Sequence, residues 1–376
     1  MNEFAKIIAV EAVPVSIRGA RDFKISEGGT REHVSVLLRI RTDVDGLEGV
    51  AEVVSAPPGK PEEFSEEIQG AIRRYVAPAL TGLGVGERTR ATMRVDGLLK
   101  GRPWTKAAVN VALHDLQARA LGVPVATLLG GRFADRVPVI GPVIGIDHPD
   151  TMSRIAAGQA AAGVKAIKIK VGETILADID RVRAVRDAIG PGVQLRVDAN
   201  DHYRPADAIR LIRAIEATEP EHIEQPVSRR DLLGMAEVRR NVGTPIMTDD
   251  AVATPEEAMT AIRLQACDRM KVKVTKHGLD GARLIVEMLQ AAGLGAVLGH
   301  VFELGLAASA EAHFAAATPC LIGPHEIGSM QPMGTTEDII EETLHREPGF
   351  IDVPDGPGLG VTVSWDRLAV QRQGAA

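Results

Sequence analysis

Ala166-Ile-Lys-Ile-Lys-Val-Gly172 is the stretch of sequence that decides the fold. Successive side chains of an extended strand point to opposite faces, so Lys168 and Lys170 share one face while Ile167 and Ile169 share the other. Two ammonium groups on an apolar strand are costly to bury unless they have charged partners. The strand therefore predicts carboxylates on neighbouring strands.

Those carboxylates follow at regular spacing along the chain. Short apolar runs alternate with amphipathic segments of helical periodicity, and the apolar runs end on a charged residue. The strand-end residues are Lys170, Asp198, Glu224, Asp249 and Lys273. Successive members of this series lie 28, 26, 25 and 24 residues apart, a step typical of parallel strands joined by crossover helices.

This repeat predicts a (β/α) barrel in the second part of the chain. The expected strands are Val137–Ile146, Ala166–Val171, Gln194–Asp198, His222–Glu224, Pro245–Asp249, Arg269–Val274 and Ala296–Gly299. Eight such units occupy roughly 200–250 residues in a closed barrel, and residues 131–341 can just supply them. The predicted fold class is therefore α/β, with residues 131–341 as the catalytic domain.

The first 130 residues predict a different module. The β-rich runs are Val10–Ile17, Val34–Thr42 and Leu47–Val53. The segments of helical periodicity are Pro61–Leu80, Glu87–Leu99 and Thr105–Leu121. Asp43-Val-Asp-Gly46 is a hairpin signal, Thr105 is a candidate N-cap, and polar Arg18–Arg31 predicts a mobile loop. Strands followed by helices indicate an α+β domain in residues 1–130, which we expect the tail 342–376 to join.

Composition excludes several classes of function. The net charge is -7, and no basic stripe interleaved with aromatic residues occurs, so we expect no nucleic-acid partner. No run of about 18 apolar residues occurs, so we expect no membrane partner. The two cysteines, Cys267 and Cys320, do not form a Cys-x-x-Cys motif and are expected to be buried thiols. These features predict a cytoplasmic protein.

The strand-end residues define a chemistry. The carboxyl ends of barrel strands form the active-site face. Asp198, Glu224 and Asp249 offer oxygen ligands without His or Cys, which suits Mg²⁺, with Mn²⁺ as the alternative. Lysines beside such an ion can act as bases when neighbouring positive charge lowers their pKa. A metal-bound carboxylate acidifies its α-proton, because the cation stabilises the enediolate.

The motifs resemble the enolase superfamily, most closely its muconate lactonizing enzyme (muconate cycloisomerase) subgroup. They are, in order, Lys-x-Lys (168–170), Asp-x-Asn (198–200), Glu-Gln-Pro (224–226), Asp-Asp (249–250) and Lys-x-x-Lys (273–276). Residues 108–121, 128–131 and 354–361 also resemble that subgroup, so the resemblance covers nearly the whole chain. It implies a modified TIM barrel of (β/α)7β-like topology with an N-terminal α+β capping domain.

The resemblance also implies roles for individual residues. Asp198, Glu224 and Asp249 would be the metal ligands. Lys170 and Lys273 would be the acid–base groups on opposite faces of the substrate, and Lys168 would bind the substrate carboxylate and keep Lys170 reactive. The groups that orient these side chains would be Asn200 and Asp250. The residues expected to contact substrate are His300, Glu303 and Glu326.

Two departures from the family pattern bear on the reaction. Lys276-His-Gly-Leu279 stands where the family has Lys-x-Gly-Gly, and Glu326-Ile-Gly328 stands where dipeptide epimerases carry Asp-x-Asp. The second departure disfavours a dipeptide substrate. We expect a Mg²⁺-dependent isomerase or lyase that is most similar to a cycloisomerase and acts on a small carboxylic acid.

Several alternatives remain open at the level of sequence. On the same site they are a racemase or epimerase of an amino-acid derivative and an acid dehydratase. A Schiff-base aldolase would use a barrel lysine without metal, and a barrel that binds a ligand without turnover is the non-enzyme alternative. The roles of Lys271 and Lys276 stay open, whereas Arg196 and His222 are expected in the barrel interior. Family members are usually oligomers, so a homo-oligomer is expected.

Overall fold

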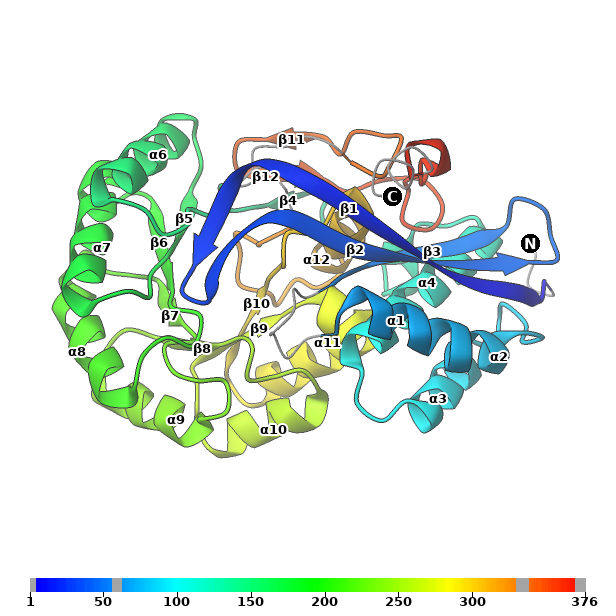
Figure 1. Ribbon diagram of the computed structural model, residues 1–376, viewed down its shortest axis with the longest axis horizontal. Helices are drawn as coiled ribbons and strands as arrows, with labels where there is room; N and C mark the ends of the chain where they lie inside the picture. The colour runs from blue at the N-terminus through cyan, green and yellow to red at the C-terminus, as the bar shows by residue number, and fades with distance from the viewer. Residues whose placement is uncertain (1–4, 56–62, 329–337, 369–376) are drawn as a thin grey trace.

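The computed structural model describes residues 5–55, 63–328 and 338–368, apart from the side chains of residues 20, 21, 30 and 31. An antiparallel sheet and a group of helices form the N-terminal part, and a curled parallel sheet ringed by helices forms the remainder (Figure 1). The predicted fold class, an α/β barrel of modified TIM-barrel type with an N-terminal capping domain, is confirmed.

The N-terminal sheet has three antiparallel strands in the order β1-β2-β3. Their bounds are β1 Ile7–Ile25, β2 Gly28–Thr42 and β3 Glu48–Val54. All three predicted β-rich runs lie in these strands, and the predicted hairpin at residues 43–46 joins β2 to β3. In Figure 1 the β1–β2 ribbon arches from this sheet over the barrel.

The expectation of a mobile loop over Arg18–Arg31 was wrong, because these residues extend the β1–β2 hairpin. Phe23 pairs with Thr30, and Ile25 with Gly28, after a register shift that begins at Arg18. The hydrogen bonds between the two strands join backbone groups and so do not require apolar side chains. One face of the ribbon is nevertheless buried, as Ile17 and Phe23 show. The polar residues of the other face produced the loop-like composition.

Helices pack on the N-terminal sheet. They are α1 Ser65–Ala71, the π-helical turn Ile72–Val76, α2 Ala77–Leu80, α3 Arg88–Leu98, α4 Pro103–Leu121 and α5 Val125–Leu128. The prediction of Thr105 as an N-cap was wrong, because α4 begins two residues earlier with Pro103 after the N-cap Arg102. The carboxylate of Glu63 accepts hydrogen bonds from the backbone N–H groups of Trp104 and Thr105 instead.

The barrel sheet contains six parallel strands in the order β10-β9-β8-β7-β6-β5. They are β5 Ala166–Lys170, β6 Gln194–Asp198, β7 His222–Glu224, β8 Ile246–Thr248, β9 Arg269–Val272 and β10 Gly295–Leu298. Each predicted strand from residue 166 to residue 299 overlaps one of them. Only the ends differ, by one or two residues.

Two further segments close the barrel between β10 and β5. On one side the backbone N–H of Glu326 donates to Leu298 of β10. On the other, Ile144 forms a parallel bridge with Ile169 of β5, while Val139 bridges to His325. The predicted strand Val137–Ile146 therefore contributes to the barrel through bridges rather than as one continuous strand. Its first residues belong to β4 Arg136–Pro138, which pairs with β12 Phe350–Asp352, itself paired with β11 Arg346–Glu347.

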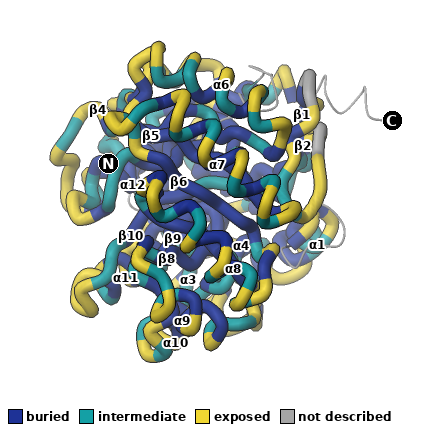
Figure 2. Tube along the Cα trace, turned by 90° about the vertical axis from the view of Figure 1, so that its left-hand side faces the viewer, coloured by how far each residue is buried: buried dark blue, intermediate teal, exposed yellow. Residues whose placement is uncertain are grey.

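Helices surround the barrel strands. They are α6 Pro149–Ala161, α7 Ile175–Ile189, α8 Pro205–Ile215, the 3₁₀ turn Glu216–Thr218, α9 Leu232–Asn241, α10 Pro255–Arg263, α11 Val274–Ala291 and α12 Gly305–Ala316. The strands are buried except at their first residues, and the helices other than the fully buried α12 expose their outer faces (Figure 2). Among the described helices, none combines the length and apolar character needed to cross a membrane.

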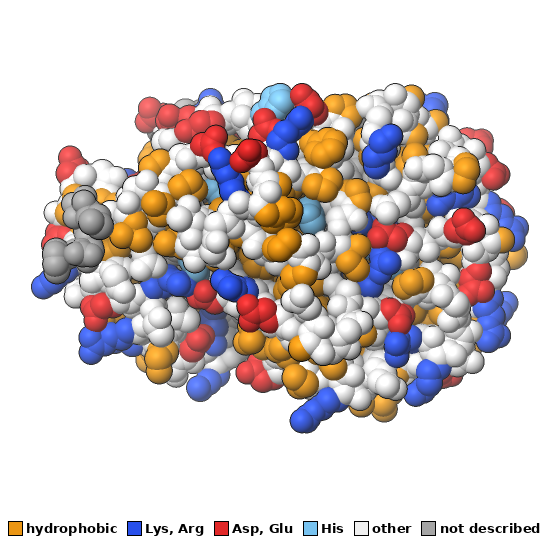
Figure 3. Space-filling view, turned by 180° about the vertical axis from the view of Figure 1, so that it is seen from behind, with side chains coloured by type: hydrophobic (Ala, Val, Ile, Leu, Met, Phe, Trp, Pro, Cys, Tyr) orange, Lys and Arg blue, Asp and Glu red, His pale blue; other side chains and the backbone are white. Residues whose placement is uncertain are grey.

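The C-terminal segment returns to the N-terminal part. The backbone N–H of Leu359 donates to Asp115 of α4 (2.7 Å), and the guanidinium of Arg39 in β2 lies 4.4 Å from the ring centroid of Trp365. Of the two cysteines, Cys267 is buried as expected, but Cys320 is exposed, which corrects that prediction. Acidic, basic and apolar side chains are interspersed over the face seen from behind (Figure 3). Residues 369–376 of the predicted tail lie outside the described part of the chain.

Candidate active site

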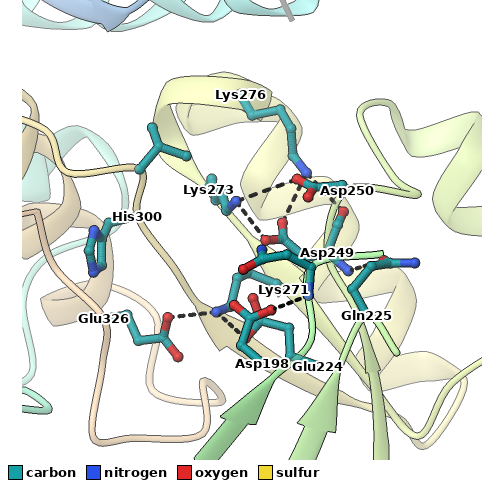
Figure 4. Close-up of polar contacts among 12 residues, drawn as sticks. Asp198, Glu224, Gln225, Asp249, Asp250, Lys271, Lys273, Lys276, His300 and Glu326 are labelled. Carbon is teal, nitrogen blue, oxygen red and sulfur yellow. Dashed lines mark hydrogen bonds and ion pairs between the residues drawn. The ribbon is translucent and has the colours of Figure 1, made fainter. Parts of the chain in front are cut away.

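The charged groups gather at the carboxyl ends of the barrel strands because the strands are parallel and in register. Lys170 pairs with Asp198, and Asp198 pairs with Glu224, on three neighbouring strands. Asp249 directly follows β8, and Lys273 directly follows β9. The sheet order thus sets a row of three carboxylates between two lysines. Figure 4 shows the three carboxylates together with Lys273.

Each of the two lysines binds the carboxylate nearest to it. Lys170 Nζ donates to Asp198 Oδ2 (2.7 Å) and to Asn200 Oδ1 (2.8 Å). Lys273 Nζ lies 2.7 Å from Asp249 Oδ2 and 3.9 Å from Asp250 Oδ1. The predicted partners Asn200 and Asp250 therefore occupy equivalent places beside the two lysines.

A second layer of ion pairs lies within the barrel. Lys168 Nζ contacts Glu224 Oε2 (2.7 Å), Asp198 Oδ2 (2.9 Å) and Glu326 Oε2 (3.0 Å). Lys271 Nζ lies 2.6 Å from both Glu224 Oε2 and Glu326 Oε2. Arg196 is fully buried and approaches the other oxygen of Glu326 at 3.4 Å. Lys271, whose role the sequence left open, thus forms a buried ion pair with two glutamates.

Burial and neighbouring charge shift the pKa values of these groups in opposite directions. Burial, followed by the charge of Asp198, raises the pKa of Glu224 to about 8. Burial alone would lower the pKa of Lys273, but Asp249 and Asp250 raise it above its usual value. Burial dominates at Lys271 and Lys276, and lowers the pKa of both. Burial, more than the neighbouring charges, therefore disfavours the charged form of Glu224, although Lys168 and Lys271 both contact it.

An unpartnered carboxylate oxygen bears on whether a cation fits the row. Glu224 Oε1 is buried and has no hydrogen-bond partner among the described residues. Three carboxylate donors with one free oxygen suit a hard divalent cation. The row of Asp198, Glu224 and Asp249 therefore has the donor chemistry for Mg²⁺, and all three residues line the same cavity.

A second cluster of side chains of metal-ligand type lies deeper in the barrel. One atom from each of His222, Glu224 and Glu326 falls within 4.8 Å of the others. Lys168 and Lys271 already occupy this space, and their charges, with that of Arg196, would repel a cation there. The charge of Arg196, after burial itself, keeps the pKa of His222 well below its usual value. The cavity-lining row is therefore the better cation site.

A cavity of about 250 Å³ opens above the row. The hairpin and α4 supply part of its wall through Phe23, His33 and Trp104, and the loop after β10 supplies His300 and Phe302. The rings of Phe23 and Phe302 meet edge to face at 4.7 Å between centroids. The capping domain and the barrel thus line one shared, partly aromatic cavity.

The predicted substrate-binding residues do not all reach this cavity. His300 lines it. Glu303 is buried beside it, where its carboxylate accepts hydrogen bonds from Thr275 Oγ1 (2.7 Å) and the Val301 backbone (2.8 Å). Glu326 is held in the ion-pair layer. Neither glutamate is among the described residues that line the cavity.

Sequence reasoning missed the wall residues of the hairpin and α4. His33 is buried, its Nε2 donates to Ser35 Oγ (2.7 Å), and that hydroxyl donates to Glu52 Oε1 (2.8 Å). The signal was the alternation of polar and apolar residues through Phe23 and His33, which marks a strand and not a loop. Trp104 gave no signal, because only the tertiary packing brings it to the barrel.

Comparisons with known proteins agree with the fold. Residues 7–130 match the mandelate racemase/muconate lactonizing enzyme N-terminal domain, and residues 151–367 match the enolase C-terminal domain-like family. Muconate cycloisomerase 1 of Rhodococcus opacus is 31% identical over 96% of this chain and 97% of its own length. The N-succinyl-L-Arg/Lys racemase of Bacillus cereus is 28% identical, with coverages of 96% and 97%.

A solved structure is equally similar. The dipeptide epimerase from Cytophaga hutchinsonii, complexed with Mg and D-Ala-L-Val, superimposes with a TM-score of 0.90 at 28% identity, covering 97% of this chain and 98% of that one. Fold, site and sequence together define an enolase-superfamily enzyme. The chain belongs to the mandelate racemase/muconate lactonizing enzyme family, which confirms the resemblance to the muconate lactonizing subgroup.

Proposed function

We propose that the protein catalyses Mg²⁺-dependent proton transfer at the carbon α to a carboxylate, as a cycloisomerase of a small carboxylic acid. One observation carries this proposal. Lys170 and Lys273 lie at the two ends of the Asp198–Glu224–Asp249 row, and all five residues line one cavity. Proton donors and carboxylates are thereby brought to the same substrate-sized space.

Asp198, Glu224 and Asp249 are the proposed ligands of the ion. The related dipeptide epimerase contains Mg in its crystal structure, which supports the choice of metal. When bound, the ion supplies a Lewis acid that stabilises the negative charge developing on a substrate carboxylate. It would also stabilise the charged form of Glu224, whose pKa is raised to about 8 by burial first and by the charge of Asp198 second.

The lysines of this chain would then move the proton. In a lactonisation, one substrate carboxylate adds across a conjugated carbon–carbon double bond, and a lysine ammonium gives its proton to the carbon α to the other carboxylate. Lys170 or Lys273 is positioned for this step. Lys168 would hold the substrate carboxylate and keep positive charge beside Lys170. Neutral walls contributed by Phe23 and Phe302 would restrict access of water.

Glu326 favours cycloisomerisation over reaction of a free α-amine. Its carboxylate contacts Lys168 and Lys271 at 3.0 and 2.6 Å and is therefore already neutralised. A substrate ammonium group would meet in Glu326 a carboxylate that two lysines already neutralise. A substrate without a free amine avoids that difficulty.

Epimerisation of an N-acylated amino acid is the second candidate. The equivalent placement of Lys170 beside Asn200 and Lys273 beside Asp250 favours it, since two opposed lysines can remove and return a proton on opposite faces. The relative that racemises N-succinyl amino acids gives the corresponding substrate class.

One experiment separates these reactions. The enzyme with Mg²⁺ is incubated in D₂O with cis,cis-muconate or with N-succinyl-L-lysine, and products are followed by NMR. Cycloisomerisation incorporates one deuterium at the α-carbon of the lactone, and only one of Lys170→Ala and Lys273→Ala lowers kcat/KM by about 100-fold or more. Epimerisation requires both lysines. Turnover that persists in EDTA, or in both alanine variants, would refute the proposal.

The proposed ion site has its own test. Asp249→Asn changes only the cavity-lining carboxylates, and His222→Gln changes only the deeper group. Titration calorimetry with Mg²⁺ should show that Asp249→Asn lowers the Mg²⁺ affinity more than about 100-fold. A loss of that size exceeds what is typical when a residue that only supports a metal ligand is changed. His222→Gln should bind Mg²⁺ as tightly as the wild type. The reverse pattern would move the ion to the deeper group.

A further inference from the structure

We propose that the turn of the β1–β2 hairpin, Ser26 and Glu27, positions both lysines of the active site through two chains of polar contacts. The chains approach each other where Arg229 of the second chain also pairs with Asp201, next to Asn200 of the first. The inference rests on the proposed function only in naming Lys170 and Lys273 as the proton-transferring groups. The two adjacent turn residues act as positioning residues, because they reach the lysines through other side chains.

The first chain runs from Ser26 to Lys170. Ser26 Oγ donates to the backbone oxygen of Asn200 (2.7 Å), and the side-chain oxygen of Asn200 accepts from Lys170 Nζ (2.8 Å). Asn200 has φ of 40°, a left-handed conformation that a non-glycine residue adopts at a cost. The contact with Ser26 helps to hold that conformation, and with it the acceptor for Lys170.

The second chain runs from Glu27 to Lys273. Glu27 Oε1 lies 2.8 Å from Arg229 Nη2, which lies 3.4 Å from Asp250 Oδ2. The other oxygen of Asp250 lies 3.9 Å from Lys273 Nζ. Side-chain exposure falls from 29% at Glu27 through 13% at Arg229 and 15% at Asp250 to 4% at Lys273. These contacts therefore lead from Glu27, which lines the cavity, to the more deeply buried Lys273.

The turn is docked where it can engage both chains. A Cβ on Gly172, two residues beyond Lys170, would lie 2.4 Å from Ser26 Cβ, so only glycine allows this approach. The backbone oxygen of Lys24 accepts from Ile146 (2.9 Å), and Lys24 Nζ lies 2.6 Å from Glu173 Oε1. Docking of one hairpin turn thus sets the surroundings of both lysines, while Phe23 and Ile25 of the same hairpin line the cavity.

The chemical reactivity of the lysines tests this arrangement without substrate. The full-length protein is trace-labelled with acetic anhydride, and each lysine is quantified by mass spectrometry against the exposed Lys165. Ser26→Ala should raise labelling of Lys170 about fivefold, the effect of losing one hydrogen bond, and leave Lys273 unchanged. Glu27→Gln should do the reverse.

Lys24→Met is the matched control, since it removes a contact of the hairpin with the barrel that belongs to neither chain. It should leave both lysines within about twofold of wild type, as for an exposed ion pair. The proposal would be overturned if Ser26→Ala or Glu27→Gln changed the labelling of both lysines equally, or if neither variant changed it. It would also be overturned if Lys24→Met changed the labelling of one lysine selectively. Absence of turnover on every substrate would refute the proposed function and leave this result standing.

Discussion

At the scale of single residues, the alternation of Lys168 and Lys170 within an apolar strand was sufficient to predict buried carboxylate partners. The carboxylates at the strand ends were predictable, but the further partners were not. Glu326 comes from a segment without regular secondary structure, yet it binds Lys271, and Lys276 Nζ donates to the backbone oxygen of Asp249 (2.9 Å). These pairings depend on the tertiary structure, which brings together Lys271 and Glu326, 55 positions apart, and Lys276 and Asp249, 27 positions apart.

The buried ion pair of Lys271 leads to a prediction about stability. Lys271→Met should lower the free energy of unfolding by about 3–5 kcal/mol, because Glu224 and Glu326 would lose a buried partner. Lys24→Met removes an ion pair whose lysine side chain is 53% exposed, and should cost at most about 1 kcal/mol. Urea denaturation of both variants without Mg²⁺ measures the difference. Equal midpoints would show that Lys271 contributes no more than a surface lysine.

At the scale of elements, periodicity predicted the central residues of each strand and helix. It did not predict which groups form hydrogen bonds with the backbone at the ends of these elements. The hairpin formed by β1 and β2 was mistaken for a loop, because its polar face dominates the composition. For α4, residue type and local position predict Thr105 as the N-cap. The group that binds the first N–H donors is Glu63, about forty residues earlier, and local sequence carries no signal for such a contact.

The contact of Glu63 with α4 can be tested directly. Its carboxylate accepts from Trp104 N (2.9 Å) and Thr105 N (3.2 Å), and Glu63 is buried. Glu63→Ala should cost about 2 kcal/mol of stability, since two donors at the helix start lose their acceptor. Glu63→Gln keeps an acceptor oxygen and should cost less. Thermal or urea unfolding distinguishes them, and equal losses would show that packing, not hydrogen bonding, is responsible.

At the scale of the whole molecule, the regular step between strand ends predicted the barrel, and the ordered motifs predicted the family. Contacts between distant parts were less accessible to sequence. Glu52 of β3 accepts from the backbone N–H groups of Leu304 (3.0 Å) and Ala307 (3.2 Å) at the start of α12, and so joins the N-terminal sheet to the barrel. The other end of α12 contacts the C-terminal segment through His313.

His313 makes the stability of this long-range contact dependent on pH. Its Nε2 donates to the backbone oxygen of Leu359 (3.2 Å), and its Nδ1 is buried without a partner among the described residues. A proton on Nδ1 would have no acceptor, and burial lowers the pKa of His313 to about 4. In the unfolded chain the pKa is about 6.5.

The unfolded state therefore binds a proton between these two values while the folded state does not, so stability is complete above pH 6.5 and declines as the pH falls towards 4. Between pH 7.5 and 5, His313 should account for a loss on the order of 2 kcal/mol. Urea denaturation at both values should show a smaller loss for His313→Gln, whose amide can still donate to Leu359. His148→Gln, at a ring that is 71% exposed, should retain the wild-type pH dependence. Parallel curves for wild type and His313→Gln would assign the acid sensitivity to other groups.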